Sequence, residues 1–128
     1  VLKIVSSVYE DISIRTLSDI NQSLIQRISD YLGIKTIFRN ASEFIQEGDR
    51  VERLISICDQ LGATTYLSAP AAKDYIGDEF EESGLILQWM EYGPFEEYEQ
   101  NVDTFSDYVS IIDTIAALGP DTRNNFLR

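Results

Sequence analysis

Residues 61–76 read LGATTYLSAPAAKDYI, and this stretch decides the fold. A helix ends at residues 61–62, an apolar extended run follows over residues 64–68, and the Ser-Ala-Pro of residues 68–70 opens a further helix. Glycine ends helices because it adopts the left-handed conformation without a steric penalty. Proline suits the first helical position, where its missing N–H would have no partner. The stretch therefore predicts a helix–Gly–strand–helix succession, which is typical of α/β proteins.

The same succession occurs once before this stretch. Apolar residues recur every three or four positions over residues 17–31, which predicts an amphipathic helix. Thr16 and Asp19 have the spacing of a capping box at its start, and Gly33 follows its end. Residues 34–39 are rich in β-branched and aromatic side chains, and we expect them to form a strand.

The helix that leads into Gly62 also has its own start signal, and a third succession follows it. Asp49 and Glu52 form a second capping-box pattern. Residues 70–76 and 78–83 are predicted to be helical, and residues 85–92 to form a strand. The three successions together predict an α/β fold, a three-layer-like arrangement in which helices flank a small, mainly parallel sheet.

Both ends of the chain lie outside these three units. Residues 93–105 (GPFEEYEQNVDTF) break the periodicity and predict a long acidic-aromatic loop, and a last helix is expected to begin at Ser106. We see no interdomain linker and expect one α/β domain over residues 1–128. Because residues 1–10 resemble the later part of a helix and the chain begins with Val1, we expect that a segment upstream is missing.

The composition excludes several classes of function. Formal net charge is −12, and no basic residue stands between Lys73 and Arg123, so a phosphate backbone would be repelled and nucleic acid is excluded as a partner of this half. Without histidine, Ser-His and Cys-His catalysis cannot occur within this chain. Cys58 lies on an apolar helix face and is interpreted as a buried small hydrophobe. No spacing fits a calcium loop and no apolar run reaches membrane-span length, so we expect no metal, no cofactor and a cytoplasmic protein.

The end of the second strand is the main candidate for a binding site. In parallel sheets, ligands bind beyond the carboxyl ends of the strands. Ser68 and Ala69 would lie there, with Lys73 one turn into the next helix, and Arg39 at the end of the first strand would share this edge. The alternative is structural: Ser68 caps a helix, Lys73 is solvated, and Arg39 pairs with Glu43 or Glu47.

Further candidates allow two readings each. Tyr92 and Tyr98, in and beside the acidic loop, either fold back as a small satellite core or present a stacking surface for a sugar ring. Arg50 and Arg53 stand in a helical first turn, where cations are disfavoured by the helix dipole, and salt bridging to this acidic chain is the simpler explanation. Asp113 lies among isoleucines and is expected to face the core, either as a tie between helix and loop or as part of a site.

Three stretches of the chain resemble the WbqC-like family, of which only the C-terminal part would be present. They are LSDINQSLIQRISDYLGIKT (17–36), GDRVERLISICDQLGATTYLSAPAAKDYI (48–76) and DYVSIIDTIAALG (107–119). The resemblance implies a role in surface-polysaccharide (O-antigen) biosynthesis, with aminoacyl (glycine) transfer as the suggested reaction. It carries no agreed catalytic residues. Two features depart from the family pattern: Ala69 stands where the family usually has glycine, and the N-terminal Q-P-x-Y-x-P-W type motif has no counterpart.

Two functions therefore compete. The first is a transferase acting on a nucleotide-sugar or sugar-linked acceptor, with Arg39, Ser68 and Lys73 binding the anionic donor and the loop from Tyr92 to Tyr98 contacting the sugar. The second is a non-catalytic domain that docks onto polysaccharide-assembly enzymes. In either case we expect the missing N-terminal segment of the same protein to pack against this chain.

Overall fold

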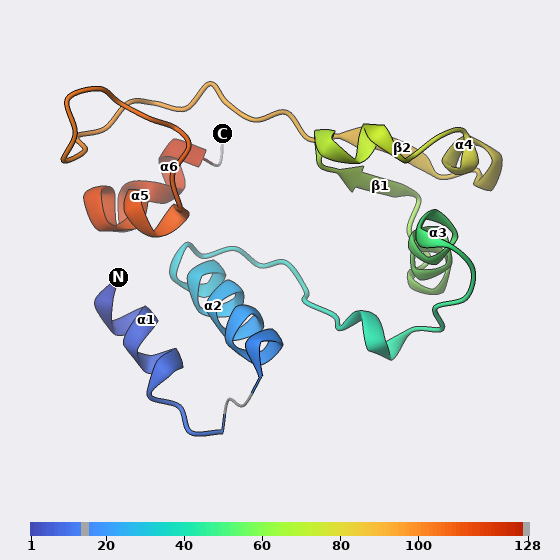
Figure 1. The fold of residues 1–128 in the computed structure, drawn as a ribbon, viewed down its shortest axis with the longest axis horizontal. Coiled ribbons are helices and arrows are strands. Elements are labelled where there is room, and N and C mark those ends of the chain that lie inside the picture. The colour runs from blue at the N-terminus through green and yellow to red at the C-terminus, as the bar shows by residue number, and fades with distance from the viewer. Residues whose placement is uncertain (14–15, 127–128) are drawn as a thin grey trace. The chain divides into compact units, whose positions relative to one another are not determined.

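The computed structural model describes residues 1–13 and 16–126, which form two compact units (Figure 1). The sheet unit comprises Arg39–Gly93, and the helical unit comprises Val1–Phe38 together with Pro94–Arg128. The expectation of a single domain over residues 1–128 stays a prediction.

Both strands lie in the sheet unit, together with two α-helices and two short 3-10 helices. In chain order these elements are η1 (Ala41–Glu43), α3 (Arg50–Leu61), β1 (Thr65–Ser68), η2 (Pro70–Asp74), α4 (Glu79–Ser83) and β2 (Ile86–Trp89). The strands pair in parallel, with Thr65 opposite Ile86 and Ser68 opposite Trp89. The α/β fold, with helices flanking a small parallel sheet, is therefore confirmed (Figure 1).

The ends of α3 form as their sequence predicts. The Asp49 carboxylate accepts hydrogen bonds from the backbone N–H groups of Val51 (2.8 Å) and Glu52 (3.0 Å), and the Glu52 carboxylate accepts one from the Asp49 N–H. Gly62 ends the helix with φ +63°, a conformation that favours glycine. These two ends fix the direction in which the chain enters β1.

The core of the sheet unit is apolar and centres on Phe80, which is fully buried. The Tyr66 ring stacks on the Phe80 ring with 4.9 Å between centroids. Five other buried residues complete the cluster: Val51, Cys58, Ala72, Ile76 and Leu85. The core therefore joins α3, η2, α4 and the sheet.

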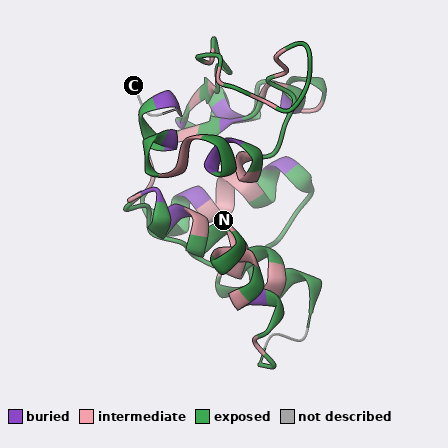
Figure 2. Ribbon diagram, turned by 90° about the vertical axis from the view of Figure 1, so that its left-hand side faces the viewer, coloured by how far each residue is buried: buried purple, intermediate pink, exposed green. Residues whose placement is uncertain are grey.

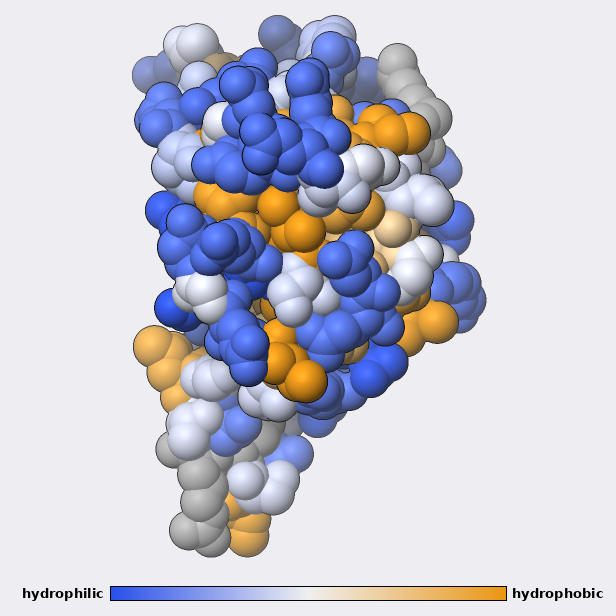
Figure 3. Space-filling model, turned by 90° about the vertical axis from the view of Figure 1, so that its right-hand side faces the viewer, coloured by the Kyte–Doolittle hydropathy of each residue, from blue (hydrophilic) through white to orange (hydrophobic). Residues whose placement is uncertain are grey.

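The sheet buries one face. Tyr66, Leu87 and Trp89 pack against the core cluster, and Ser68 on the same face is buried. Residues that alternate with them, such as Leu67 and Ile86, are 53% and 57% exposed. This is the period of two that a strand imposes on its side chains. Figure 3 views the side of the molecule on which α3 and α4 lie in Figure 1, and there apolar surface stands between larger hydrophilic areas.

The helical unit contains no strand in its described residues. Its elements are α1 (Leu2–Tyr9), α2 (Leu17–Tyr31), α5 (Ile111–Leu118), η3 (Gly119–Asp121) and α6 (Thr122–Phe126). Helix α1 packs on α2, and α5 packs with η3 and α6. Its buried positions, purple in Figure 2, are scattered, and many of them are polar. They are Val8, Ser29, Leu32, Thr114, Ile115, Thr122 and Asn125. No helix among residues 1–13 and 16–126 is both long and apolar enough to span a membrane.

Two predictions about secondary structure were wrong. Residues 34–39 form no strand, and Ile37 within them is 84% exposed. These residues have high β propensity, but they pair with no neighbouring strand among the described residues. A segment forms a strand only when such pairing is available. The last helix begins at Ile111 and not at Ser106, because Ser106 exchanges two 2.9 Å hydrogen bonds with the Gln100 side chain and closes the loop. Ser110 caps the helix, its hydroxyl accepting from the Ile112 N–H.

Candidate functional site

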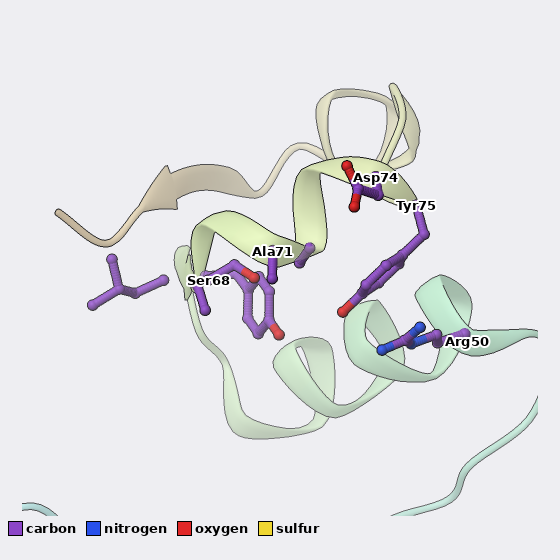
Figure 4. Close-up of a pocket in the computed structure, with 9 residues that line it drawn as sticks. Arg50, Ser68, Ala71, Asp74 and Tyr75 are labelled. Atoms are coloured by element: carbon purple, nitrogen blue, oxygen red, sulfur yellow. The ribbon is translucent and has the colours of Figure 1, made fainter. Parts of the chain in front are cut away.

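A pocket of about 490 Å³ opens in the sheet unit at the carboxyl end of β1. The first turn of α3, the strand end and η2 supply its walls (Figure 4). The lining residues are Arg50, Tyr66, Leu67, Ser68, Ala69, Ala71, Ala72, Asp74 and Tyr75. The volume lies within the range of roughly 300–1,000 Å³ that is typical of small-molecule sites.

Ser68 is the most buried polar residue of this pocket. Only 5% of its surface is exposed, and its carbonyl accepts a 2.8 Å hydrogen bond from the Met90 N–H. No described residue hydrogen-bonds to its hydroxyl. Ala69 continues in extended conformation (φ −71°, ψ 148°) before Pro70 opens η2. The structure thus places both predicted residues at the strand end, with the Ser68 hydroxyl available to a ligand.

Arg50 forms the opposite wall together with Tyr75. The guanidinium carbon lies 3.5 Å from the centroid of the Tyr75 ring. In Figure 4 the Tyr75 side chain extends from the end of η2 to Arg50, while Ser68 lies at the far end of η2. Sequence reasoning assigned Arg50 to salt bridging and missed this role. The sequence did contain a signal for such a role. A cation in the first turn of a helix is disfavoured by the helix dipole, so its presence there indicates an interaction outside the helix.

The pocket has one carboxylate, that of Asp74. It is the other charged group of the lining and belongs to the last position of η2. None of the described residues forms a salt bridge or a side-chain hydrogen bond with it. Together with the Arg50 guanidinium, this carboxylate gives the pocket both signs of charge, and the alanines of η2 add apolar surface to the lining.

Two predicted binding residues of the sheet unit lie outside the pocket lining. The Lys73 ammonium stands over the Trp89 ring, 5.3 Å from its centroid. Arg39 is bound to Glu43 through two contacts of 2.7 Å and lies over the Phe44 ring. Because residues 34–39 form no strand, the expectation that Arg39 shares a sheet edge with Ser68 was wrong.

The pairing with Arg39 is one of the contacts that change the pKa of the Glu43 carboxyl. Two hydrogen bonds lower the pKa of Glu43 below its ordinary value. The larger effect comes from the Asn40 backbone N–H, and the second comes from the Arg39 side chain. Both donors favour the ionised carboxylate. Arg39 therefore helps to fix η1, and its predicted role in binding stays a prediction.

The two tyrosines predicted to contact a sugar differ in surroundings. Tyr92 is 64% exposed and does not line the pocket. Tyr98, in the helical unit, donates to the Asp113 carboxylate (2.8 Å) and lies within 3.0 Å of the Thr114 hydroxyl. Its ring meets the Phe105 ring edge to face at 5.3 Å. These contacts correspond to the satellite-core reading of Tyr98, while a sugar-binding role for either residue stays a prediction.

Two remaining sequence expectations are resolved by burial. Asp113 is exposed and does not face the core, yet it does tie its helix to the loop through Tyr98. Cys58 is buried in the core, and burial, followed by the nearby Asp59 carboxylate, raises the pKa of its thiol. A raised pKa disfavours the nucleophilic thiolate, in agreement with a packing role. Within residues 1–13 and 16–126, no three Cys, Asp or Glu side chains gather as metal ligands would.

Comparison with known proteins relates the whole chain, and not the pocket, to a family. The model of the WbqC-like protein family matches residues 1–125. The Mycobacterium tuberculosis (strain ATCC 25618 / H37Rv) protein Rv1507c, described as uncharacterized, is 33% identical over 106 residues. The match covers 82% of this chain and 46% of Rv1507c, so the chain spans about half the length of that relative. No solved structure matches the chain.

Proposed function

Because this chain belongs to the WbqC-like protein family, we propose that it is a transferase domain of surface-polysaccharide (O-antigen) biosynthesis that binds a nucleotide-sugar or another sugar-linked substrate in the pocket beside β1. The reaction proposed is transfer of an aminoacyl group, glycine being the suggested one. The resemblance described above supplies the pathway and the reaction. The geometry of this chain supports the place of binding.

One observation carries the proposed site: a buried serine, whose hydroxyl has no hydrogen-bond partner among the described residues, stands at the carboxyl end of a parallel strand, on a pocket large enough for a small molecule. The Ser68 hydroxyl is not among the fully buried side-chain atoms that lack a partner, so it can be reached from the pocket, and a polar ligand that bonded to it would gain about 0.5–1.5 kcal/mol. The carboxyl ends of parallel strands are also where α/β proteins hold their ligands.

The chemistry of the lining fits binding more closely than catalysis. With no histidine in the chain, a general base would have to be a carboxylate, a lysine or a tyrosine. The pocket offers the Asp74 carboxylate and the hydroxyls of Tyr66 and Tyr75. Since this chain spans about half of the relative it matches, we propose that it contributes substrate binding and that further catalytic groups come from the rest of a full-length protein.

Thermal unfolding in the presence of nucleotide-sugars tests the proposal. Uridine-, guanosine- and thymidine-diphosphate sugars are added singly, with the free nucleosides as controls. A ligand at ten times its Kd stabilises the folded state by about 1.4 kcal/mol. For a chain of this size we expect a rise in Tm of roughly 4–8 °C with at least one nucleotide-sugar.

A pair of serine variants locates the binding. Ser68→Ala should weaken binding about 2- to 10-fold, the usual cost of one hydrogen bond. Ser29→Ala is the matched control, because Ser29 is also buried (8% exposed) but lies in the helical unit. Equal Tm shifts in wild type and Ser68→Ala would remove Ser68 from the site. If no nucleotide-sugar changes Tm, the rival function, a docking domain for polysaccharide-assembly enzymes, replaces the transferase.

A further inference from the structure

We infer that Arg50, held against the ring of Tyr75, is the anion-binding residue of the pocket, and that Asp74 accepts hydrogen bonds from hydroxyls of the same ligand. This inference deepens the proposed function and rests on it for the identity of the site. It names the ligand class as a phosphorylated sugar, in which a phosphate or diphosphate and a hydroxyl-bearing ring stand side by side.

The first support is that the Arg50 guanidinium has no hydrogen-bond or ion-pair partner among the described residues. Among the arginines that the structure describes, it is the one that makes no hydrogen bond and no ion pair. The others bond as follows: Arg27 to Ser7 and Asp11, Arg39 to Glu43, Arg53 to the Gly48 carbonyl, and Arg123 to the Gly33 carbonyl. This is unexpected in a chain with 22 acidic and 10 basic residues. The N–H groups of Arg50 are therefore free for an external anion.

The second support is the way in which Tyr75 holds this cation. A guanidinium that lies on an aromatic ring uses its flat face for the contact and keeps its N–H edge open. That edge can donate two parallel hydrogen bonds to a phosphate or carboxylate. With 3.5 Å between the guanidinium carbon and the Tyr75 ring centroid, Arg50 is arranged in this manner at the rim of the pocket. The ring thus prepares the geometry before any ligand arrives.

The third support is the carboxylate in the same lining. Asp74 would repel an inorganic phosphate or pyrophosphate, because the carboxylate and these anions carry charge of the same sign. A sugar ring offers neighbouring hydroxyls, and a carboxylate accepts hydrogen bonds from such donors through its two oxygens. A ligand that presents phosphate to Arg50 and hydroxyls to Asp74 satisfies both groups, whereas a bare anion satisfies one. The pocket is therefore expected to prefer phosphorylated sugars over inorganic anions.

Calorimetric titration of the intact chain tests the role of Arg50. The probes are uridine diphosphate, which carries both a diphosphate and ribose hydroxyls, inorganic pyrophosphate, and uridine. Arg50→Ala should weaken the binding of uridine diphosphate about 10- to 100-fold, as expected for lost charge-assisted hydrogen bonds. Arg50→Lys keeps the charge, loses the planar fork, and should give an intermediate loss. Because Arg50 is exposed, neither change should disturb folding.

Arg53 is the matched control. It lies one helical turn from Arg50 on α3 and outside the pocket lining, and its Nε already donates to the Gly48 carbonyl at 2.9 Å. Arg53→Ala removes the same charge from the same helix and should change the Kd of uridine diphosphate less than about 2-fold, because Arg53 does not line the pocket and exposed charges without direct contact interact weakly in water. Equal losses in the two alanine variants would overturn the inference, because they would show a general effect of charge.

Asp74→Asn separates the two halves of the ligand. The variant should bind pyrophosphate several-fold more tightly because a repulsive charge is gone, and uridine diphosphate more weakly relative to pyrophosphate because the amide accepts fewer hydrogen bonds. If both ligands respond alike, Asp74 does not contact hydroxyls and the ligand class named here is wrong.

The outcomes distinguish this inference from the proposed function. Uridine diphosphate binding that is unaffected by Arg50→Ala would refute the anion-binding role and leave the proposed function intact. Binding of pyrophosphate that depends on Arg50, in the absence of binding by any nucleotide or nucleotide-sugar, would support the role of Arg50 and refute the proposed function.

Discussion

The sheet unit and the helical unit differ in what they bury. The sheet unit buries a compact apolar cluster around Phe80, and its one buried polar residue, Ser68, faces a pocket. In the helical unit, Thr114, Thr122 and Asn125 are buried together with a few apolar residues. The Nδ2 of Asn125 donates to the Glu96 carbonyl, but its buried Oδ1 has no partner among the described residues.

This difference assigns the units different physical tasks. An apolar core is close-packed and holds neighbouring elements rigidly, which is what a preformed pocket requires. Hydrogen bonds that involve side chains secure a long segment that lacks regular structure: in the acidic loop, Tyr98 donates to the Asp113 carboxylate and the Gln100 side chain accepts from the Ser106 N–H. We expect the sheet unit to be sensitive to lost volume and the helical unit to lost hydrogen bonds.

The largest expected effect is that of Phe80→Ala. Phe80 is fully buried at the centre of the cluster, so its truncation should lower the free energy of unfolding of the sheet unit by about 3–5 kcal/mol. The single tryptophan, Trp89, packs against this cluster, so its fluorescence in a urea titration reports on this unit. The exposed Leu67→Ala is the control and should change the midpoint little. A fluorescence transition that Phe80→Ala leaves unmoved would contradict the assignment of the core.

A smaller effect is expected from Tyr98→Phe. The change removes one hydroxyl that bonds to Asp113 and Thr114, at a cost of about 1–2 kcal/mol. Amide hydrogen exchange should speed up over residues 95–105 and at the start of α5, while Trp89 fluorescence stays as in wild type. Tyr108→Phe is the control, because Tyr108 is 95% exposed. Equal exchange in both variants would show that the loop is held by something other than this hydroxyl.

The smallest effect is predicted for the helix caps, which the two units have in common. Thr16 caps α2 in the helical unit and Asp49 caps α3 in the sheet unit, each within a complete capping box. Changing either residue to alanine should cost about 1 kcal/mol. Only Asp49→Ala should move the Trp89 fluorescence transition, and Asp49→Asn should largely restore it. If Thr16→Ala moves that transition equally, the units do not unfold separately.

Local signals in the sequence were sufficient for much of the fold. Capping boxes, glycines at helix ends and the register of apolar residues depend on neighbours within a few positions, and α2, α3 and α4 formed where these signals stood. The strand predicted over residues 34–39 failed because a strand depends on a partner far away in the chain. Ser106 failed as a helix start because Gln100, six residues before it, bonds to its backbone.

For the candidate site too, residues whose position follows from local sequence were predicted, and residues that depend on distant contacts were not. Ser68 and Ala69 were found because their position after a strand defines the edge at which they lie. Arg50 was missed because its place in the pocket depends on contact with the Tyr75 ring. Tyr75 is 25 positions away in the sequence, and no local pattern connects the two residues. Lys73 and Arg39 have the chemistry for anion binding, yet their contacts with Trp89 and Glu43 depend on side-chain packing that a linear pattern does not encode.

The sheet of only two strands has a consequence for how copies of this protein behave in solution. Within the described residues, β1 and β2 each have a hydrogen-bonded neighbour on one side only, and an unpaired strand edge is a template for association with another chain. Two properties oppose such association: each strand has four residues, and a net charge of −12 keeps copies apart. The acidity of the chain therefore provides colloidal protection, which weakens when salt screens the carboxylates or acid neutralises them.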